Sequence, residues 1–536
     1  MMDELAAKLI KRADALRTLR QRHDEVWKDC FDHTYPIRGE GFYDGRYGGA
    51  DTAKDRVSRL LTSVATDSSR MLASALVSGM TPAQAQWFDL GQTGDIDNER
   101  EWFSTSAKII WENIHAGNFD SEGYEANLDV VCAGWFALYV EEGADSMFSF
   151  QQWPIAQVCV ATTRKDGIVD TIFRRYQLSA EQAAEEFGQD NVSTKIRNAL
   201  ASKPDQKFDF IHAIYPRKTA GGKLLAKNLP FASVHVEVAD KRVVRESGYH
   251  ECPVCCPRWM KIPNSVYGIG PVYDALPSIK ELNEWLRMEK AAGDLAVSGM
   301  WIAEDDGVLN PRTVKVGPRK IIAASSTEAM KPLLTGSDFN VAFSSEERLE
   351  AQIRKILMAD QLQPQDGPAM TATEVHVRVA LIRQLLGPVY GRFQAEYLQT
   401  LVNRCFGIAF RAGALPQVPE SIAGKTFTVR YISPLAQAQK LDEVTSIERL
   451  SQNVAYLAQM SPDVVDLIDA DQATRVIADA LGVPAKILRS DDDVEELREQ
   501  REQQQQDEQQ QQMAQQLGAQ AATQVVENTM GKDDDA

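Results

Sequence analysis

The sequence predicts a mainly α-helical fold with a β-rich middle section, an α+β class. Up to about Glu142, apolar residues recur at three- and four-residue spacing, which is typical of amphipathic helices. Short runs rich in β-forming residues follow until about Tyr267, and long helical patterns then return. At 536 residues the chain exceeds the size at which a single hydrophobic core keeps growing, so we expect two to four packed regions.

Charge and composition restrict the class of function. The formal net charge of −18 argues against a protein that grips nucleic acid with a broad basic surface, but not against one that encloses DNA without holding it. The longest apolar run, from Val130 to Val140, is shorter than the ~20 residues of a membrane span, and the amphipathic N-terminal segment does not resemble a signal peptide. The seven cysteines are scattered, which favours assembly in a reducing cytosol over a disulfide framework.

Residues 1–150 are expected to be mostly helical. A first helix near the N terminus has an apolar face, and a second is predicted from Asp55 to Met80, where a Thr81-Pro82 turn ends it. The apolar face of the first helix consists of Leu5, Leu9, Ala13, Leu16 and Leu19.

Residues 151–265 are predicted to form a small β-rich unit. The runs "QVCVAT", "KFDFIHAIY" and "ASVHVEVAD" have strand composition and are separated by Gly, Lys and Pro, with "SAEQAAEEFG" as a short helix among them. We interpret His212, in the second run, as a strand residue whose ring has a hydrogen-bond partner.

Residues 266–305 are expected to contain a long helix, in which Lys280 and Glu284 form an ion pair across one turn. Residues 306–358 then give short strands around "TVKVGPRKIIAAS" and the helix "SEERLEAQIRKILMAD". The section 359–370 is predicted to be a loop, because "QLQPQDGPAM" has two prolines and no apolar periodicity. The apolar face of the long helix consists of Leu276, Ile279, Leu282 and Leu286.

Residues 371–410 are predicted to form one helix, about 50 Å long over its 371–406 pattern at ~1.5 Å per residue. Thr371 and Glu374 have the spacing of a capping box. The apolar stripe continues in phase across Gly387 and Pro388, which indicates a kink and not an end. Two interpretations remain open: a helix that spans a domain within a monomer, and a strut that follows the curved wall of a ring. The stripe consists of Val375, Val379, Ile382, Leu386, Val389, Phe393, Tyr397, Leu401 and Cys405.

The C-terminal part divides into residues 411–500, with helical patterns, and a Gln-rich acidic tail at residues 501–536. From Asp491 onward there are thirteen Asp and Glu residues against three Lys and Arg. Such low complexity predicts a frayed helix that grades into disorder.

The sequence offers few candidates for chemistry. "AGKTF" at residues 423–427 has the end of a P-loop, but Pro419 occupies the place of the first glycine and a strand pattern follows where a helix is needed. "HECPVCC" contains His250, Cys252, Cys255 and Cys256, which could bind zinc or form a strand edge with buried thiols. No spacing identifies a catalytic residue, and we expect no enzyme, no cofactor and no metal.

Several segments, taken in order, resemble the head-to-tail connector (portal) proteins of short-tailed, double-stranded DNA phages. The resemblance covers about residues 5 to 500. It is carried by "YPIRG" from Tyr35, the stretch from Asp51 to Phe88, "VYGIGPVYDALPSIKELN" from Val266, "TATEV" from Thr371, "LGPVYGRFQAEYL" from Leu386, "AGALPQVPE" from Ala412 and "SPLAQAQK" from Ser433.

The resemblance implies a portal fold with wing, stem, clip and crown, assembled as a ring of about twelve subunits. Residues 1–150 would be the helical wing part, 151–265 would contain the clip, 266–305 would be the stem helix and 306–358 would be wing strands and helix. The tunnel loop would be 359–370, the kinked wing helix 371–410 and the crown 411–500.

Particular residues acquire roles from the same resemblance. Those expected to face DNA in the tunnel are Gln361, Gln363, Gln365, Asp366 and the nearby Lys355. The predicted loop has no Lys or Arg of its own, although basic residues are often found near the channel in such proteins. Lys280, Glu284 and Arg287 would belong to the stem helix, and Gly387 and Pro388 would form the kink of the wing helix.

The resemblance also implies partners and a location. The ring would lie at one capsid vertex, assemble in the host bacterial cytoplasm, nucleate head assembly and pass double-stranded DNA during packaging and ejection. Its partners would be the terminase large subunit, a tail adaptor protein, and the major capsid and scaffolding proteins, with no membrane. An acidic ring would keep a polyanion from sticking as it slides. The alternatives are another virion ring component, such as a tail adaptor, or a cytosolic enzyme with an unrecognised carboxylate site.

Overall fold

The computed structural model describes most of the first 300 residues and selected parts of the rest. The described residues are 2–43, 50–84, 86–91, 97–217, 226–298, 301–303, 330–332, 339–362, 387, 389–419, 428–431, 444, 446–454, 456–457, 469–481, 494, 497–498, 500–501 and 503–504. The chain divides into two compact units. Unit 1 contains Met1–Phe88, Lys108–Pro416 and Ser433–Leu435, and unit 2 contains Asp89–Ala107, Gln417–Ile432 and Ala436–Ala536.

Helices dominate the N-terminal part, as the sequence predicts, but the predicted helix from Asp55 to Met80 is two helices. Its interruption at residues 58–63 has a physical cause: the backbone N–H of Leu61 donates to Asn283 Oδ1, 3.0 Å away, and that of Val64 donates to Thr62 Oγ1. These side chains replace helical carbonyls as acceptors. The elements are α1 (Met2–Asp32), η1 (Glu40–Phe42), α2 (Ala50–Val57), α3 (Val64–Met80), α4 (Asp97–Ala116) and α5 (Phe119–Ala133).

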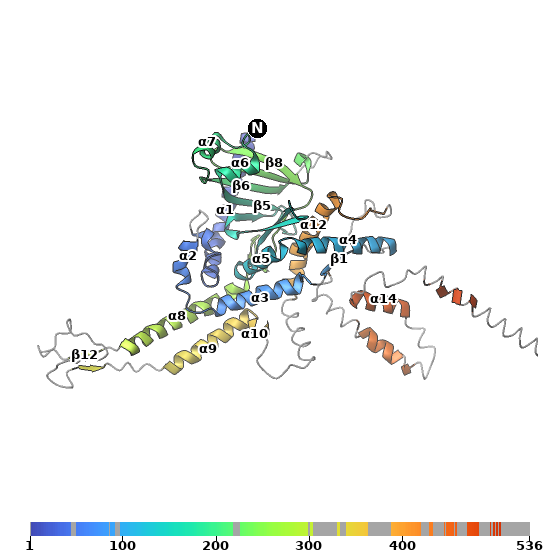
Figure 1. The fold of residues 1–536 in the computed structure, drawn as a ribbon. Coiled ribbons are helices and arrows are strands. Elements are labelled where there is room, and N and C mark those ends of the chain that lie inside the picture. Colours follow the sequence, from blue (N-terminus) through green and yellow to red (C-terminus); the bar gives the residue numbers. More distant parts are fainter. Residues whose placement is uncertain are drawn as a thin grey trace, which may run out of the picture. The chain divides into compact units, whose positions relative to one another are not determined.

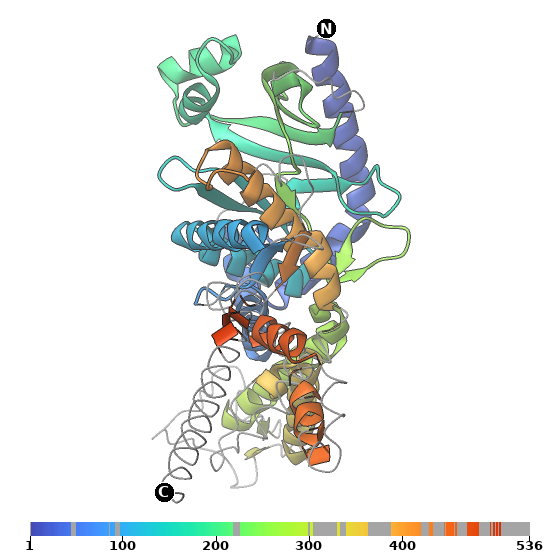
Figure 2. The same cartoon turned by 90° about the vertical axis from the view of Figure 1, so that its right-hand side faces the viewer.

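The β-rich middle section forms a five-stranded antiparallel sheet with strand order β4-β5-β6-β7-β8. One face of this sheet packs against α1, which runs alongside it in both views (Figures 1 and 2). The sheet and the N-terminal helix therefore share one hydrophobic core, which contains Leu9, Leu16, Phe173, Ile211 and Val234. The strands are β4 (Val158–Ala161), β5 (Thr171–Ser179), β6 (Lys207–Pro216), β7 (Phe231–Glu237) and β8 (Arg242–Tyr249).

The opposite face of the sheet packs, toward one end, against two short helices, α6 (Ala180–Phe187) and α7 (Thr194–Ser202). The predicted helix in "SAEQAAEEFG" is confirmed as α6, and Ser179 and Gln182 form a capping box at its start. Phe210 lies in this second core while its neighbour Ile211 lies in the first, as the alternation of a strand requires.

A smaller antiparallel sheet has the order β3-β2-β9 and comprises β2 (Ala137–Glu142), β3 (Phe148–Trp153) and β9 (Val254–Cys255). Two further strands, β10 (Met260–Lys261) and β11 (Gly268–Ile269), pair with each other, and η2 (Ile155–Gln157) and η3 (Ala226–Asn228) are short 3₁₀ turns. In "HECPVCC", Cys255 and Cys256 are buried, at 1% and 6% exposure, so the interpretation as a strand edge with buried thiols is confirmed.

The passage from α5 to β2 depends on a glycine. Gly134 has a φ of +87°, and its carbonyl accepts a hydrogen bond of 2.8 Å from the backbone N–H of Trp259. A Cβ atom at Gly134 would lie 2.1 Å from the carbonyl carbon of Ile269 and 2.4 Å from the nitrogen of Gly270. Only a residue without a side chain fits this backbone conformation and this close approach.

Two long helices follow the sheets, α8 (Pro271–Ser298) and α9 (Phe339–Ile356), and they pack against each other (Figure 1). Strands β12 (Trp301–Ala303) and β13 (Met330–Pro332) pair antiparallel between them in sequence. Because α8 leads into β12 and β13 leads into α9, the two helices are antiparallel. The predicted strands at residues 313–325 lie outside the described residues.

The second half of the predicted wing helix is helical from Val389 to Arg411, but it contains a π-helical turn, η4 (Gln394–Leu398), before α12 (Gln399–Arg411). The predicted apolar stripe is buried at Phe393, Tyr397, Leu401 and Cys405. Gly387 is helical, whereas residues 371–386 and Pro388 lie outside the described residues, so the capping box and the kink stay predictions.

Within the C-terminal unit, helix α14 (Ala470–Leu481) begins where Asp469 Oδ1 accepts hydrogen bonds of 3.0 Å from the backbone N–H groups of Asp471 and Gln472. Residues 446–454 are also helical. Strand β14 (Thr428–Tyr431) pairs with β1 (Phe88–Gly91). Because β14 is a strand directly after "AGKTF", the helix that a P-loop needs is absent at this position. Residues 505–536 of the acidic tail lie outside the described residues.

Candidate functional site

The helix pair α8–α9 carries four of the eight residues that the sequence analysis assigned to a stem or channel. The predicted apolar face of α8 is buried at Leu276, Ile279 and Leu282, while Leu286 is half-buried. On α9, Leu349 and Ile353 are buried. These apolar stripes hold the two helices in place and leave their polar faces in solvent.

The predicted ion pair between Lys280 and Glu284 is wrong. Lys280 Nζ lies 2.6 Å from Asp29 Oδ2, near the end of α1, and Glu284 Oε1 instead lies 2.6 Å from Arg287 Nη2. Lys280 therefore ties α8 to α1, because a long-range carboxylate competes with the one a turn away. Glu284 and Arg287 are neighbours on the exposed face of α8, where such a pair contributes little stability.

Carboxylates from the two helices approach each other where α8 and α9 pack. Burial, and after it the nearby carboxylates of Glu289, Glu350 and Glu347, raises the pKa of Glu346. Glu289 belongs to α8 and the other three belong to α9. Ionised Glu346 thus opposes the contact between the helices.

Replacing Glu346 with glutamine is expected to increase the free energy of unfolding at pH 7 by roughly 0.5 kcal/mol in low salt, the size of a like-charge contact on a helix surface. A carboxylate whose folded pKa is raised destabilises the fold above that pKa, and the penalty disappears as the pH falls below its unfolded pKa. Urea unfolding at pH 7 and pH 4 should therefore show a gain only at pH 7. An equal gain at both pH values would contradict the electrostatic explanation.

The residues predicted to face DNA are only partly described. Lys355 is exposed on α9, and no ion pair to it is present among the described residues. The predicted loop 359–370 begins as a helix, α10 (Ala359–Leu362), so Gln361 is helical, while Gln363, Gln365 and Asp366 lie outside the described residues. Met358, with a φ of +58°, separates α9 from α10 and turns the chain between them.

Sequence reasoning missed a buried ion pair that joins distant segments. Arg258, at 2% side-chain exposure, donates to Glu396 through its backbone N–H at 3.1 Å, through Nε at 3.0 Å and through Nη2 at 2.5 Å. Glu396 lies in the π turn. The sequence signal for the π turn is a run of apolar residues spaced by four: Val389, Phe393, Tyr397, Leu401 and Cys405. In a regular α-helix, side chains four residues apart rotate about 40° around the helix axis relative to each other. A wider π turn reduces this rotation and keeps the apolar side chains on one face.

A second missed cluster lies on α12. Arg404 Nη1 and Arg411 Nη1 both contact the carboxylate of Glu251, at 3.2 and 2.7 Å. Gly407 allows this, because a Cβ atom there would lie 2.4 Å from Glu251 Oε1. The arginines at positions 404 and 411 are seven residues apart, two turns of helix, which is the only trace of this cluster in the sequence.

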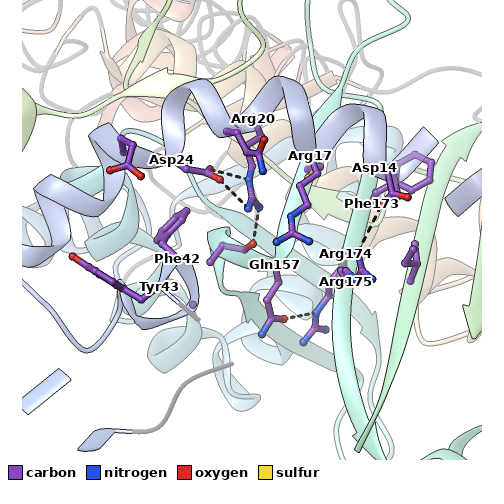
Figure 3. Close-up of a pocket in the computed structure, with 17 residues that line it drawn as sticks. Asp14, Arg17, Arg20, Asp24, Phe42, Tyr43, Gln157, Phe173, Arg174 and Arg175 are labelled. Carbon is purple, nitrogen blue, oxygen red and sulfur yellow. Dashed lines mark hydrogen bonds and ion pairs between the residues drawn. The ribbon is translucent and has the colours of Figure 1, made fainter. Parts of the chain in front are cut away.

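A cavity of about 390 Å³ lies between α1 and the sheet (Figure 3). Arg20 is buried there, although the predicted apolar face would have turned Leu19 inward, and Leu19 is 56% exposed. Arg20 Nη1 donates to the carbonyls of Ile155, Ala156 and Val158 at 2.6 to 3.1 Å, and Arg20 Nε lies 3.0 Å from Asp24 Oδ1. The role of Arg20 is structural: its guanidinium donates hydrogen bonds to backbone carbonyls that would otherwise lack a donor at the turn before β4.

Comparison with known proteins decides the family. The family model described as bacteriophage head to tail connecting protein matches residues 6–488. The chain belongs to this family. Among curated proteins, the probable portal protein of Bordetella phage BPP-1 is 27% identical over 508 residues, and the portal protein of Salmonella phage epsilon15 is 25% identical over 511. Each alignment covers 92% of this chain and 90% of the relative.

Solved structures give weaker likenesses to this head-to-tail connecting protein. A chain from the neck of an empty GTA particle computed with C6 symmetry matches with a TM-score of 0.34 and 13% sequence identity. The match covers 70% of this chain and 84% of that chain. The neck of a native GTA particle computed with C12 symmetry has a TM-score of 0.32 and 12% identity, covering 75% and 90%.

Family membership decides between the structural and enzymatic alternatives. Head-to-tail connecting proteins are structural components of the phage particle, so the prediction of a non-enzymatic virion protein is confirmed and the alternative of a cytosolic enzyme is wrong. Among the described residues, no group of three or more His, Cys, Asp or Glu side chains could hold a metal ion. Burial raises the pKa of the Cys252 thiol to about 11.

In the part of the chain that the structure describes, no helix has the length and apolar character needed to cross a membrane.

Proposed function

We propose that this head-to-tail connecting protein is the portal subunit, which forms a ring of about twelve copies around a channel for double-stranded DNA. The observation that carries the proposal is the match of the family model over residues 6–488, nearly the whole chain. Two relatives named as portal proteins, aligned over 92% of this chain, support the portal over a tail adaptor. A net charge of −18 on each subunit suits a channel through which a polyanion slides without sticking.

Helix α8 is the proposed stem, with α9 packed beside it. Lys280, Glu284 and Arg287 lie on the polar side of α8, and the pairing of Lys280 with Asp29 would fix the stem to α1. Lys355, Gln361, Gln363, Gln365 and Asp366 are the proposed DNA-facing residues at the end of α9 and in the segment after it. The kink at Gly387 and Pro388 would let the wing helix follow the wall of the ring.

The clip could be formed by either of two parts of the chain. The sequence prediction places it within residues 151–265, but the five-stranded sheet there shares a core with α1. The paired strands β12 and β13 connect the far ends of α8 and α9, which favours them for a part that projects beyond the stem. We therefore prefer the β12–β13 region as the clip that meets terminase and later the tail.

The remaining partners follow from the proposed position at one capsid vertex. The ring would nucleate the head together with major capsid and scaffolding proteins, dock the terminase large subunit during packaging and then hold a tail adaptor protein. Residues 411–500 would form the crown, and assembly would take place in the host bacterial cytoplasm.

A triple variant in which Gln361, Gln363 and Gln365 are each replaced by lysine is expected to package DNA about twofold or more slowly at low salt. The added lysines would bind DNA phosphates electrostatically, and this attraction weakens as the salt concentration rises. In vitro packaging into proheads at low and high salt measures the effect. The control is a variant with lysine at Gln189, Gln206 and Gln399, exposed positions outside the proposed channel. Equal rates for both variants would show that residues 361–365 do not meet the DNA.

A further inference from the structure

Four adjacent strands of the large sheet place a row of nitrogen-bearing side chains opposite one another. The register pairs Arg174 of β5 with His212 of β6, His212 with His235 of β7, and His235 with Arg245 of β8. Residues directly opposite in an antiparallel sheet share a face, so the order across the sheet is Arg, His, His, Arg.

The two histidines at the centre of the row are buried and stacked. Their exposures are 4% and 8%, and the ring centroids lie 3.9 Å apart with an interplanar angle of 16°. His212 Nε2 lies 2.9 Å from Ser233 Oγ, and His235 Nδ1 lies 3.0 Å from the hydroxyl of Tyr176. For the other ring nitrogen of each histidine, the described residues provide no hydrogen-bond partner.

The row lines a cavity of about 630 Å³. Tyr139 and Trp153 from the smaller sheet also line it, and the hydroxyls of Tyr139 and Tyr249 lie 2.8 Å apart. This volume falls in the range of small-ligand sites, roughly 300–1,000 Å³, and the combination of aromatic walls with a few convergent polar groups is typical of such sites.

The charges around the cavity favour an anion at the centre of the row. Burial is the main cause that lowers the pKa of both histidines, that of His235 to about 3, and the charges of Arg174 and Arg245 lower it further. Both guanidinium groups therefore act on the place where the imidazoles lie. Arg245 is exposed, and no carboxylate lies within ion-pair distance of it among the residues described.

Among the other charged groups of the cavity, two arginines are paired, and the charges of Arg245 and Arg174 act on the carboxylate of Glu186. Arg404 and Arg411 are held by Glu251. Glu141, Glu142 and Glu186 also line the cavity and are exposed. The cavity between α1 and the sheet differs, because its buried Arg20 already contacts Asp24 and three carbonyls (Figure 3).

We propose that the cavity between the two sheets binds a small oxyanion, with Arg174 and Arg245 as its cationic partners and the unpartnered nitrogens of His212 and His235 as hydrogen-bond partners. Phosphate and carboxylate groups share this chemistry. The residues of this site all belong to one chain, and because Tyr139 and Trp153 of the smaller sheet line the same cavity, a bound anion would lie between the two sheets.

The test is isothermal titration of the full-length protein with inorganic phosphate at pH 7 and constant ionic strength, with acetate as a second ligand. We expect one saturable site per chain and a dissociation constant about tenfold weaker in Arg245→Gln, the loss of one charged hydrogen bond. Arg197→Gln is the matched control: it removes the same charge from an exposed position on α7, outside the cavity, and should leave binding unchanged.

A second variant, His235→Asn, should also weaken binding, and circular dichroism would establish that both variants remain folded. Tighter binding of phosphate than of acetate would identify a phosphate site, and the reverse would identify a carboxylate site. Absence of saturable binding, or equal binding by the wild type and Arg245→Gln, would overturn the proposal.

Discussion

Replacing Arg258 with methionine is expected to lower the free energy of unfolding by about 3–5 kcal/mol, because it removes the cationic partner of Glu396 and leaves that carboxylate, only 10% exposed, with the backbone N–H of residue 258 alone. Arg258 supplies three donors to that carboxylate and two more to the carbonyls of Val266 and Gly167. Urea unfolding at a fixed protomer concentration measures the loss.

Two further variants define what the Arg258 result means. Arg287→Met breaks the exposed pair with Glu284 and should cost only about 0–1 kcal/mol. The double variant Arg258→Met with Glu396→Leu removes both charges and should recover much of the loss, because no buried charge remains. A double variant as unstable as Arg258→Met would show that the missing side-chain volume, and not the unpaired carboxylate, is responsible.

Replacing Gly134 with alanine is expected to lower the free energy of unfolding by about 3–5 kcal/mol. This loss is the sum of two costs: placing a residue with a side chain in the left-handed backbone region, and overpacking its Cβ atom against neighbouring backbone atoms. The Cβ atom would lie 2.1 Å from the carbonyl carbon of Ile269, and a shift of the Gly134 backbone away from it would disturb the hydrogen bond of 2.8 Å from Trp259 to the Gly134 carbonyl. Thermal unfolding and the yield of soluble protein are the measurements.

Gly413 provides the matched control. It also has a positive φ, +69°, but a Cβ atom there meets nothing within 4 Å. Gly413→Ala should therefore cost only the backbone term, about 1–2 kcal/mol. If both substitutions had the same effect, the close approach of Ile269 would play no part in stability.

Local structure was predictable where a few neighbouring residues decide it. The capping residues of α6 and the strand-forming composition of β6 and β7 are complete within about ten residues of sequence, and these elements were predicted correctly. The break between α2 and α3 was not, since it depends on Asn283, more than two hundred residues away. The same holds for Lys280, which binds Asp29 rather than its neighbour on the helix.

The candidate sites were less predictable than the fold because they depend on register and assembly. The row of Arg174, His212, His235 and Arg245 is scattered over about seventy residues and exists only once four strands align. The DNA-facing residues come from the resemblance alone, since a channel is a property of a ring, and one chain does not contain it. The family, by contrast, was identified from ordered segments along the chain, and the family model confirms it.

The most direct test of the central claim is mass photometry of the purified full-length protein, followed by negative-stain images of the dominant species. The account predicts particles of about 0.7 MDa, twelve chains of 59.6 kDa, that appear as rings with a central hole. A monomer or dimer without a hole, over the whole concentration range, would contradict the proposed ring-forming portal subunit.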